Sequence, residues 1–453
     1  MNVSALIDRR FSTFQIEVLI LCFFMSLIDG FDSQIMSVAV PALVEDMNLP
    51  PSALGALLSA SQWGALVGAL TLGNYADRVG RRLVLIFCGL LLSATMIGTA
   101  MAGSHLELVV LRILTGLGVG GAMPCFIALS IEYSPRRYRS TVASIVCSGV
   151  PVGGIVVGMM GAAMMPELGW RSVFWAGGAL SLAVTLLTAW RIPESVAFAI
   201  AQRYPAAAIR RILERLAPGE IDAGETRFFT DDSAAGQVKA SVRELFRGNL
   251  AWVTMLCWIA FFLSYIVLIG TLVWTPGLMR QSGMDMSSAS LVLSLNNVGG
   301  LVGFIVGGYL ADRFRGRFWL TLMLIYGGGT CSVFFMGVLA PAFWPVAVSA
   351  ILVGFFIAAG VGVLYAFTAL LYPVSVRSTG VGWASGAARI GASMGPLILG
   401  WLYAGGWGVT EMLSVLAALA LANIVIIRMM GVASTIRRNA ASEHTTGATP
   451  PAA

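Results

Sequence analysis

Four ionisable side chains lie inside long apolar runs of this 453-residue sequence, and their types and spacing are suited to handling charge. Asp29 and Asp32 are three residues apart, so in a helix both carboxylates project from one face. Two carboxylates held together away from water would repel if both were ionised, so at least one is expected to take up a proton. Arg112 and Arg389 carry guanidinium groups, which stay protonated and present a planar fork suited to a carboxylate. Proton uptake and anion binding are the chemistry that these residues predict.

Each of these residues also has a purely structural interpretation. The two aspartates can cap or hydrogen-bond a helix that is broken at Gly30. The two arginines can hold helices together through backbone carbonyls and acids. In the functional interpretation, Arg112 pairs with an acid of the first apolar run and Arg389 binds a substrate carboxylate, with the reverse assignment left open.

The apolar runs that hold these residues are long enough to cross a membrane. Hydrophobic residues make up 58% of the chain and charged residues 11%, against roughly 25% charged in soluble proteins. A soluble chain has no interior large enough for so much apolar side chain, so the lipid bilayer is the expected surrounding. Twelve membrane-spanning helices are predicted, at about 16–40, 53–74, 83–103, 107–131, 140–165, 171–190, 250–275, 287–310, 318–339, 343–370, 378–403 and 408–429.

The remaining charges set the orientation rather than a nucleic-acid site. Of the 28 basic residues, 24 fall in the segments that share one side of the membrane with both termini. The positive-inside rule then places both termini in the cytoplasm. The six cysteines form no CxxC pair and the two histidines are far apart, so no metal site is predicted. No other cofactor is predicted, and protons are the expected coupling ion.

The chain repeats itself. Gly-Asn-Tyr-Ala-Asp-Arg at 73–78 matches Gly-Tyr-Leu-Ala-Asp-Arg at 308–313, which is 235 residues further on. Duplicated halves that face each other are typical of alternating-access transporters. The predicted domains are a six-helix bundle over 1–190, a cytoplasmic central loop over 191–249, a second bundle over 250–430 and a disordered cytoplasmic tail over 431–453.

These motifs carry a family resemblance. The segment 73–82, Gly-Asn-Tyr-Ala-Asp-Arg-Val-Gly-Arg-Arg, resembles the loop signature of the major facilitator superfamily. The segment 112–120, Arg-Ile-Leu-Thr-Gly-Leu-Gly-Val-Gly, is similar to its fourth-helix motif, and Glu132 with Arg139 is similar to the acid–arginine pair at the end of that helix. The second half departs from the pattern, because Leu370 stands where the matching acid would be.

Two further segments point to a subfamily. Asp-Gly-Phe-Asp at 29–32 resembles the signature of the aromatic acid:proton symporters, and 372–396 resembles the eleventh helix of that family. The resemblance implies an all-α membrane protein of two pseudo-symmetric six-helix bundles, acting as a monomer and not as an enzyme. It implies import of an aromatic carboxylate with protons. Transport of another substrate class (a sugar, an aliphatic acid or a drug) and a transporter-like sensor are the alternatives.

Several polar and aromatic side chains in the spans are candidates for binding such a substrate. An aromatic ring can stack on a stripe at helical spacing in the seventh span, although packing or lipid contact explains the same stripe at least as well. Buried amides in the second and eighth spans need partners and can donate to a substrate oxygen. With Arg389, the candidates are Trp258, Phe262, Tyr265, Asn296, Asn297, Gln62 and Tyr365.

The charged loop motifs are expected to form a gate on the cytoplasmic side. Acids and arginines there can form ion pairs in one conformation only and so bias a two-state equilibrium. The alternative is that these arginines only fix the topology. The predicted gate consists of Gly73, Asp77, Arg78, Gly80, Arg81, Glu132, Arg139, Asp312 and Arg313.

Overall fold

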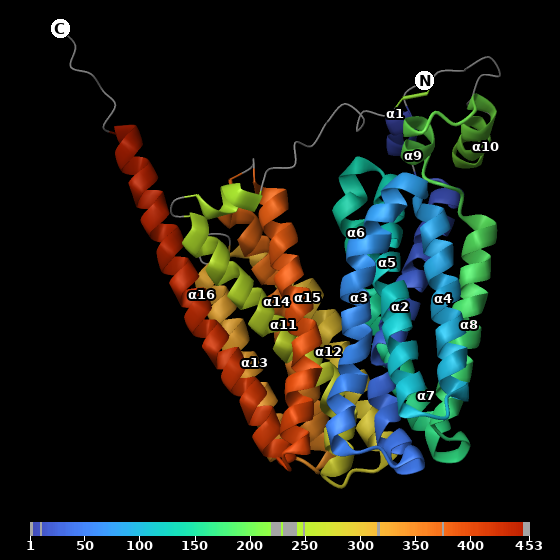
Figure 1. Cartoon of the computed structure of the whole chain (residues 1–453). Coiled ribbons are helices and arrows are strands. Elements are labelled where there is room, and N and C mark those ends of the chain that lie inside the picture. The colour runs from blue at the N-terminus through green and yellow to red at the C-terminus, as the bar shows by residue number, and fades with distance from the viewer. Residues whose placement is uncertain are drawn as a thin grey trace. The chain divides into compact units, whose positions relative to one another are not determined.

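The computed structural model describes residues 3–9, 11–218, 228–229, 242–247, 250–314, 318–373 and 376–446, and these form long helices (Figure 1). The first compact unit comprises 1–237 with 285–294, and the second comprises 238–284 with 295–453. We call them the N-terminal and the C-terminal unit. The prediction of an all-helical membrane protein is confirmed.

The helices of the N-terminal unit follow the predicted spans closely. They are α1 (Val3–Arg9), α2 (Thr13–Met47), α3 (Pro51–Val79), α4 (Arg81–Met101), α5 (His105–Glu132), η1 (Arg136–Tyr138), α6 (Arg139–Cys147), α7 (Gly149–Leu168), α8 (Trp170–Arg191), α9 (Val196–Ala201) and α10 (Ala206–Leu216). The fifth predicted span is divided at Ser148 into α6 and α7. In Figure 1, α1, α9 and α10 lie together at one end of this unit.

The C-terminal unit holds most of the remaining helices. They are η3 (Val242–Phe246), α11 (Leu250–Gln281), α12 (Met286–Arg313), α13 (Phe318–Val338), α14 (Phe343–Leu371), α15 (Arg377–Ala404) and α16 (Val409–Thr446). The first residues of α12, up to Ser294, cluster with the N-terminal unit, where Ser294 Oγ donates to the carbonyl of Ile155 at 3.0 Å.

Within the described part of the chain, eleven candidate spans are long and apolar enough to cross a bilayer. The predicted span that is absent from these eleven is the eleventh, 378–403, which corresponds to α15 and its 28 residues. Its many glycines and its serines, together with Arg389, lower its hydropathy.

Local signals set the ends of these helices. Ser12 and Gln15 form a capping box at the start of α2, in which Gln15 Oε1 accepts from the Ser12 amide at 2.7 Å. Gly80 separates α3 from α4 with a φ of 108°, a conformation that glycine adopts without strain. Helix caps and glycine turns of this kind can be recognised in the sequence, which is why the predicted spans lie close to the observed helices.

The end of the chain differs from its prediction. The last span was expected to end at 429 and the tail over 431–453 to be disordered, but α16 continues to Thr446. No glycine lies between Gly431 and Gly447 and no proline precedes Pro450, so nothing in the sequence interrupts the helix. Of the central loop predicted over 191–249, residues 219–227, 230–241 and 248–249 lie outside the described residues.

Glycines let equivalent helix pairs approach closely in each unit. A Cβ on Gly64 or Gly68 of α3 would overlap the backbone of α5, and one on Gly299 or Gly303 of α12 would overlap the backbone of α14. The two pairs of positions differ by 235 residues, the offset of the sequence repeat. The repeat therefore extends to the way the helices pack.

We expect Gly116→Ala to lower the thermal unfolding temperature of the detergent-solubilised protein by several degrees. The new Cβ would overlap the carbonyl oxygen of Ser61, and overpacking of this kind costs about 1–3 kcal/mol. Gly327→Ala in α13 is the matched control, because nothing lies within 4 Å of its Cβ and alanine favours helix. Equal unfolding temperatures for the two variants would contradict this packing.

Candidate functional site

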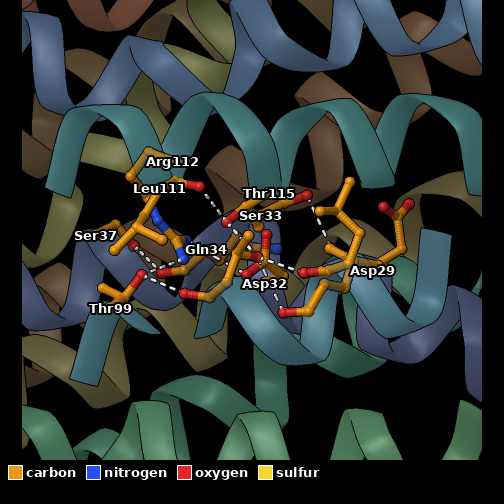
Figure 2. A network of polar contacts seen from close by, with 12 residues as sticks. Asp29, Asp32, Ser33, Gln34, Ser37, Thr99, Leu111, Arg112 and Thr115 are labelled. Atoms are coloured by element: carbon orange, nitrogen blue, oxygen red, sulfur yellow. Dashed lines mark hydrogen bonds and ion pairs between the residues drawn. The ribbon is translucent and has the colours of Figure 1, made fainter. Parts of the chain in front are cut away.

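A buried ion pair joins α2 to α5 in the N-terminal unit (Figure 2). Arg112 Nη1 lies 3.3 Å from Asp32 Oδ1, and the two side chains are 1% and 0% exposed. The structure thus brings together two of the residues that the sequence marked for charge handling. An ion pair this far from water is stable only while both partners are present.

The rest of the Arg112 guanidinium is held by α4 and α8. Its Nη2 donates to Thr99 Oγ1 at 3.1 Å, and its Cζ lies 5.4 Å from the centre of the Phe174 ring. The Thr99 hydroxyl donates in turn to the carbonyl of Thr95 at 2.7 Å. Four helices therefore meet at this one side chain.

The hydrogen bonding of the pair is incomplete. Among the described residues, Asp32 Oδ2 and Arg112 Nε have no hydrogen-bond partner. A buried polar atom that lacks a partner carries the full cost of its desolvation. The site therefore has spare capacity for a proton on the carboxylate.

Asp29 is also buried but is directed elsewhere. Its carbonyl accepts from Ser33 Oγ at 2.8 Å, and Figure 2 shows its carboxylate pointing away from the Asp32–Arg112 pair. The alternative of a helix broken at Gly30 is wrong, because α2 is continuous from Thr13 to Met47. Gly30 instead lets α7 approach, since a Cβ there would overlap the backbone of Val150.

The C-terminal unit holds Arg389 and a row of hydroxyl groups. Arg389 is half-buried on α15, within electrostatic range of Tyr265 of α11. The Tyr265 and Tyr365 hydroxyl oxygens are 3.5 Å apart, and Tyr365 lies 3.1 Å from Ser385 Oγ. Three predicted residues are thus brought together, with a serine that the sequence did not single out.

The aromatic stripe of α11 is divided between two environments. Trp258 stacks on Trp383 of α15 with ring centres 5.7 Å apart, and Phe246 of η3 packs against its edge at 5.6 Å. Trp258 therefore packs within the unit, as the structural alternative for the stripe predicted. Phe262 is half-buried, with its carbonyl against Gly391 of α15.

The three candidate amides lie on α3 and α12 and are at least half-buried. Asn296 and Asn297 of α12 are each 3% exposed, and Asn296 Nδ2 has no hydrogen-bond partner among the described residues. The carbonyl of Asn296 faces Gly354 of α14. Gln62 is half-buried on α3, at the position 235 residues before Asn297.

Part of the predicted gate forms a charge network at one end of the N-terminal unit. Arg81 pairs with Glu132 of α5 and lies 3.7 Å from Asp77, which is 70% exposed. Gly73 lies against Pro124. Gly80 provides the turn that directs Arg81 toward α5.

The other predicted gate residues lie at or near the ends of helices. Arg78 is exposed at the end of α3, and Arg139 is half-buried at the start of α6. Arg313 is exposed with its guanidinium 5.9 Å from the Phe314 ring centre. The side chain of Asp312 lies outside the described residues.

Glu194 is the residue of this network that sequence reasoning missed. Its Oε1 accepts from the backbone amides of Arg81 at 3.0 Å and Arg82 at 3.1 Å, at the N-terminus of α4. The next residue, Ser195, donates to Glu132. A carboxylate is favoured at the positive end of a helix dipole, so the two arginines that open α4 were a signal for such a partner.

We expect the Asp32–Arg112 pair to show strong coupling in a double-variant cycle of thermal stability. Asp32→Asn or Arg112→Gln alone leaves one buried charge unpaired, which costs about 3–5 kcal/mol. The double variant carries no buried charge and should lose much less than the sum of the two single losses. Additive losses would show that the two side chains do not stabilise each other.

A model of the Major Facilitator Superfamily matches this chain over residues 22–328 and 258–450. A gallate transporter of Pseudomonas putida is 35% identical over 94% of this chain and 93% of its own length. A benzoate transport protein of Acinetobacter baylyi is 32% identical over 88% of this chain and 86% of its own. A 4-hydroxybenzoate transporter of Pseudomonas aeruginosa is 30% identical over 94% and 95%.

Solved structures share the fold at lower identity. A D-xylose–proton symporter superposes with a TM-score of 0.70 at 17% identity, covering 92% of this chain and 97% of its own. A bacterial homologue of the lysosomal transporter Spinster gives a TM-score of 0.65 at 16% identity, covering 98% and 100%. The match to the family model spans most of the residues that form the two units. The chain belongs to the Major Facilitator Superfamily of transporters and is related to its aromatic acid transporters.

Proposed function

We propose that this protein imports an aromatic carboxylate together with protons by alternating access. The observation that carries the proposal is the buried Asp32–Arg112 ion pair, with one carboxylate oxygen that has no partner among the described residues. The relatives named for gallate, benzoate and 4-hydroxybenzoate transport support an aromatic carboxylate as the substrate. The proton-coupling residues are Asp29, Asp32 and Arg112.

The coupling follows from charge balance at the pair. A proton on Asp32 removes the negative charge that Arg112 neutralises, and leaves a buried guanidinium in need of another anion or of a rearrangement of α2 against α5. Either response links the protonation of Asp32 to the state of the N-terminal unit. A ligand or proton that binds one conformation better than the other shifts the population between them.

The substrate carboxylate is assigned to Arg389. This arginine is half-buried on a predicted span, and Tyr265 of the hydroxyl row formed with Tyr365 and Ser385 is within its electrostatic range. A guanidinium binds a carboxylate through two parallel N–H donors, which fixes the orientation of the ring. The path of the substrate ring is proposed to be lined by Phe262, Asn296, Asn297 and Gln62. Trp258 is proposed to support this site by packing within the unit.

The network of Arg81, Glu132 and Glu194 is proposed as the cytoplasmic gate. Its ion pair and its two amide contacts tie together α4, α5 and the segment after α8. Such an arrangement is suited to a contact that forms in one state of the cycle and opens in the other. Asp77, Arg78, Arg139, Asp312 and Arg313 are proposed to complete it, with Gly80 providing the turn between α3 and α4 and Gly73 the contact of α3 with Pro124 of α5.

The distribution of positive charge supports an orientation with both termini in the cytoplasm. Under this assignment only Arg171 and Arg280 are external. We propose that the protein lies in the bacterial inner membrane and divides functionally into bundles over 1–190 and 250–430, joined by a cytoplasmic segment over 191–249.

Proteoliposomes with an inward proton gradient are expected to accumulate labelled 4-hydroxybenzoate, and Asp32→Asn is expected to abolish the accumulation. The amide cannot be deprotonated, so it cannot release a proton on the inner side. Counterflow of substrate without a gradient is the control for a folded variant. Gradient-driven accumulation at the wild-type level in Asp32→Asn would refute the coupling role.

The same assay separates this proposal from other substrates and from a sensor. If the protein takes up a sugar or an aliphatic acid but no aromatic acid, the proposed substrate class is wrong. Binding without uptake or counterflow would favour a sensor.

Arg389→Ala is expected to weaken binding of an aromatic carboxylate by about tenfold or more, since a hydrogen-bonded charge contributes about 1.5–3 kcal/mol. Binding of the corresponding neutral amide should change much less. The comparison can be made by calorimetry on the purified protein. An equal loss for acid and amide would mark Arg389 as a structural residue.

A further inference from the structure

The hydroxyl row of the C-terminal unit makes its hydrogen bonds between helices. Several other serines and threonines in these spans donate to a carbonyl of their own helix, as Ser264 does to Ala260 at 2.7 Å and Ser393 to Arg389 at 3.0 Å. Ser385 makes no such bond among the described residues, and its contact there is Tyr365. Its hydrogen-bonding capacity is directed across the helix interface.

The two tyrosine hydroxyl groups make only a long hydrogen bond to each other. A hydroxyl–hydroxyl bond is strongest at about 2.7–2.8 Å, whereas Tyr265 and Tyr365 are 3.5 Å apart. No other hydrogen bond is made by the Tyr265 hydroxyl within the described residues. Each hydroxyl can both donate and accept, so the row has room for another polar group.

The row is held in place from two sides. The Phe261 ring packs on the edge of Tyr365 with ring centres 4.6 Å apart. Ser264, which precedes Tyr265, accepts from Asn423 Nδ2 at 2.8 Å and lies 2.6 Å from the Tyr326 hydroxyl. Because the Ser264 proton goes to Ala260, Tyr326 must be the donor in that contact. These buried contacts to α13 and α16 fix the part of α11 that carries Tyr265.

Ser385 of the row lies on the same face of α15 as Arg389. Ser385 and Arg389 are four residues apart on α15, so they lie on one face with Cβ atoms about 5–6 Å apart. Tyr265 is within electrostatic range of Arg389, and Tyr365 contacts both Tyr265 and Ser385. A carboxylate bound by Arg389 would therefore place its ring on the face of α15 that carries Ser385, the partner of Tyr365.

We propose that Tyr365 and Ser385 determine specificity by hydrogen-bonding a ring hydroxyl of the substrate, so that the protein selects phenolic aromatic acids over unsubstituted ones. This inference rests on the proposed import of an aromatic carboxylate. A site built to hydrogen-bond a hydroxyl disfavours the analogue without it, because its own polar groups are then left unpaired.

The test compares equilibrium binding of benzoate and 4-hydroxybenzoate to the purified full-length protein by calorimetry. The wild type should bind 4-hydroxybenzoate about two- to tenfold more tightly, the range of one or two neutral hydrogen bonds. Ser385→Ala and Tyr365→Phe should bring the ratio close to one while benzoate still binds. The matched control is Ser393→Ala, whose hydroxyl is used by its own helix, and it should keep the wild-type ratio.

The outcomes separate the two proposals. Equal wild-type affinities for the two acids would overturn the specificity inference and leave the proposed function standing. A preference that survives in both Ser385→Ala and Tyr365→Phe would also overturn it. If the wild type binds neither acid nor any other aromatic acid, the proposed function fails and this inference fails with it.

Discussion

The ion pair between Asp32 and Arg112 is the interaction on which the N-terminal unit depends. Neither side chain reaches water, and a single unpaired charge at that depth would cost several kcal/mol. The pair is tolerable because its net charge is zero. Protonation of Asp32 removes its negative charge and leaves the positive charge of Arg112 unbalanced. Arg112 must then move or bind another anion.

The surrounding helices amplify that dependence. Arg112 contacts α2 through Asp32, α4 through Thr99 and α8 through Phe174, so a shift of its guanidinium is felt by three neighbours. Glycines bring helix backbones into direct contact, as Gly30 does for α2 and α7 and Gly116 for α5 and α3. Side chains between these helices therefore cannot adjust to small movements of the backbone. Tight packing of this kind favours discrete alternative arrangements over gradual deformation.

Much of the fold was predictable because its determinants are local. Apolar length, glycine and proline breaks and the 235-residue repeat are all properties of neighbouring or repeated residues. The end of α16 was not predicted, because a polar composition was taken as disorder although no glycine or proline interrupts the helix before residue 447. The rarity of charge in the spans was enough to select Asp32 and Arg112 as candidates for charge handling.

The parts of the site that the sequence did not reveal depend on tertiary contacts. Asp29 and Asp32 share a helix face by spacing, yet their carboxylates point in different directions (Figure 2). The roles of Glu194 and Ser385 do not follow from the sequence, because they depend on contacts with α4 and α14. The stacking of Trp258 on Trp383 likewise joins helices that are distant in sequence.

The central claim is that protonation and substrate binding are coupled through Asp32. It is tested most directly by measuring the enthalpy of binding of 4-hydroxybenzoate in buffers with different heats of ionisation. The account predicts a binding enthalpy that depends on the buffer, showing net proton uptake by the wild type, and no such dependence in Asp32→Asn. Wild-type binding enthalpies that are independent of the buffer across the acidic to neutral range would contradict it.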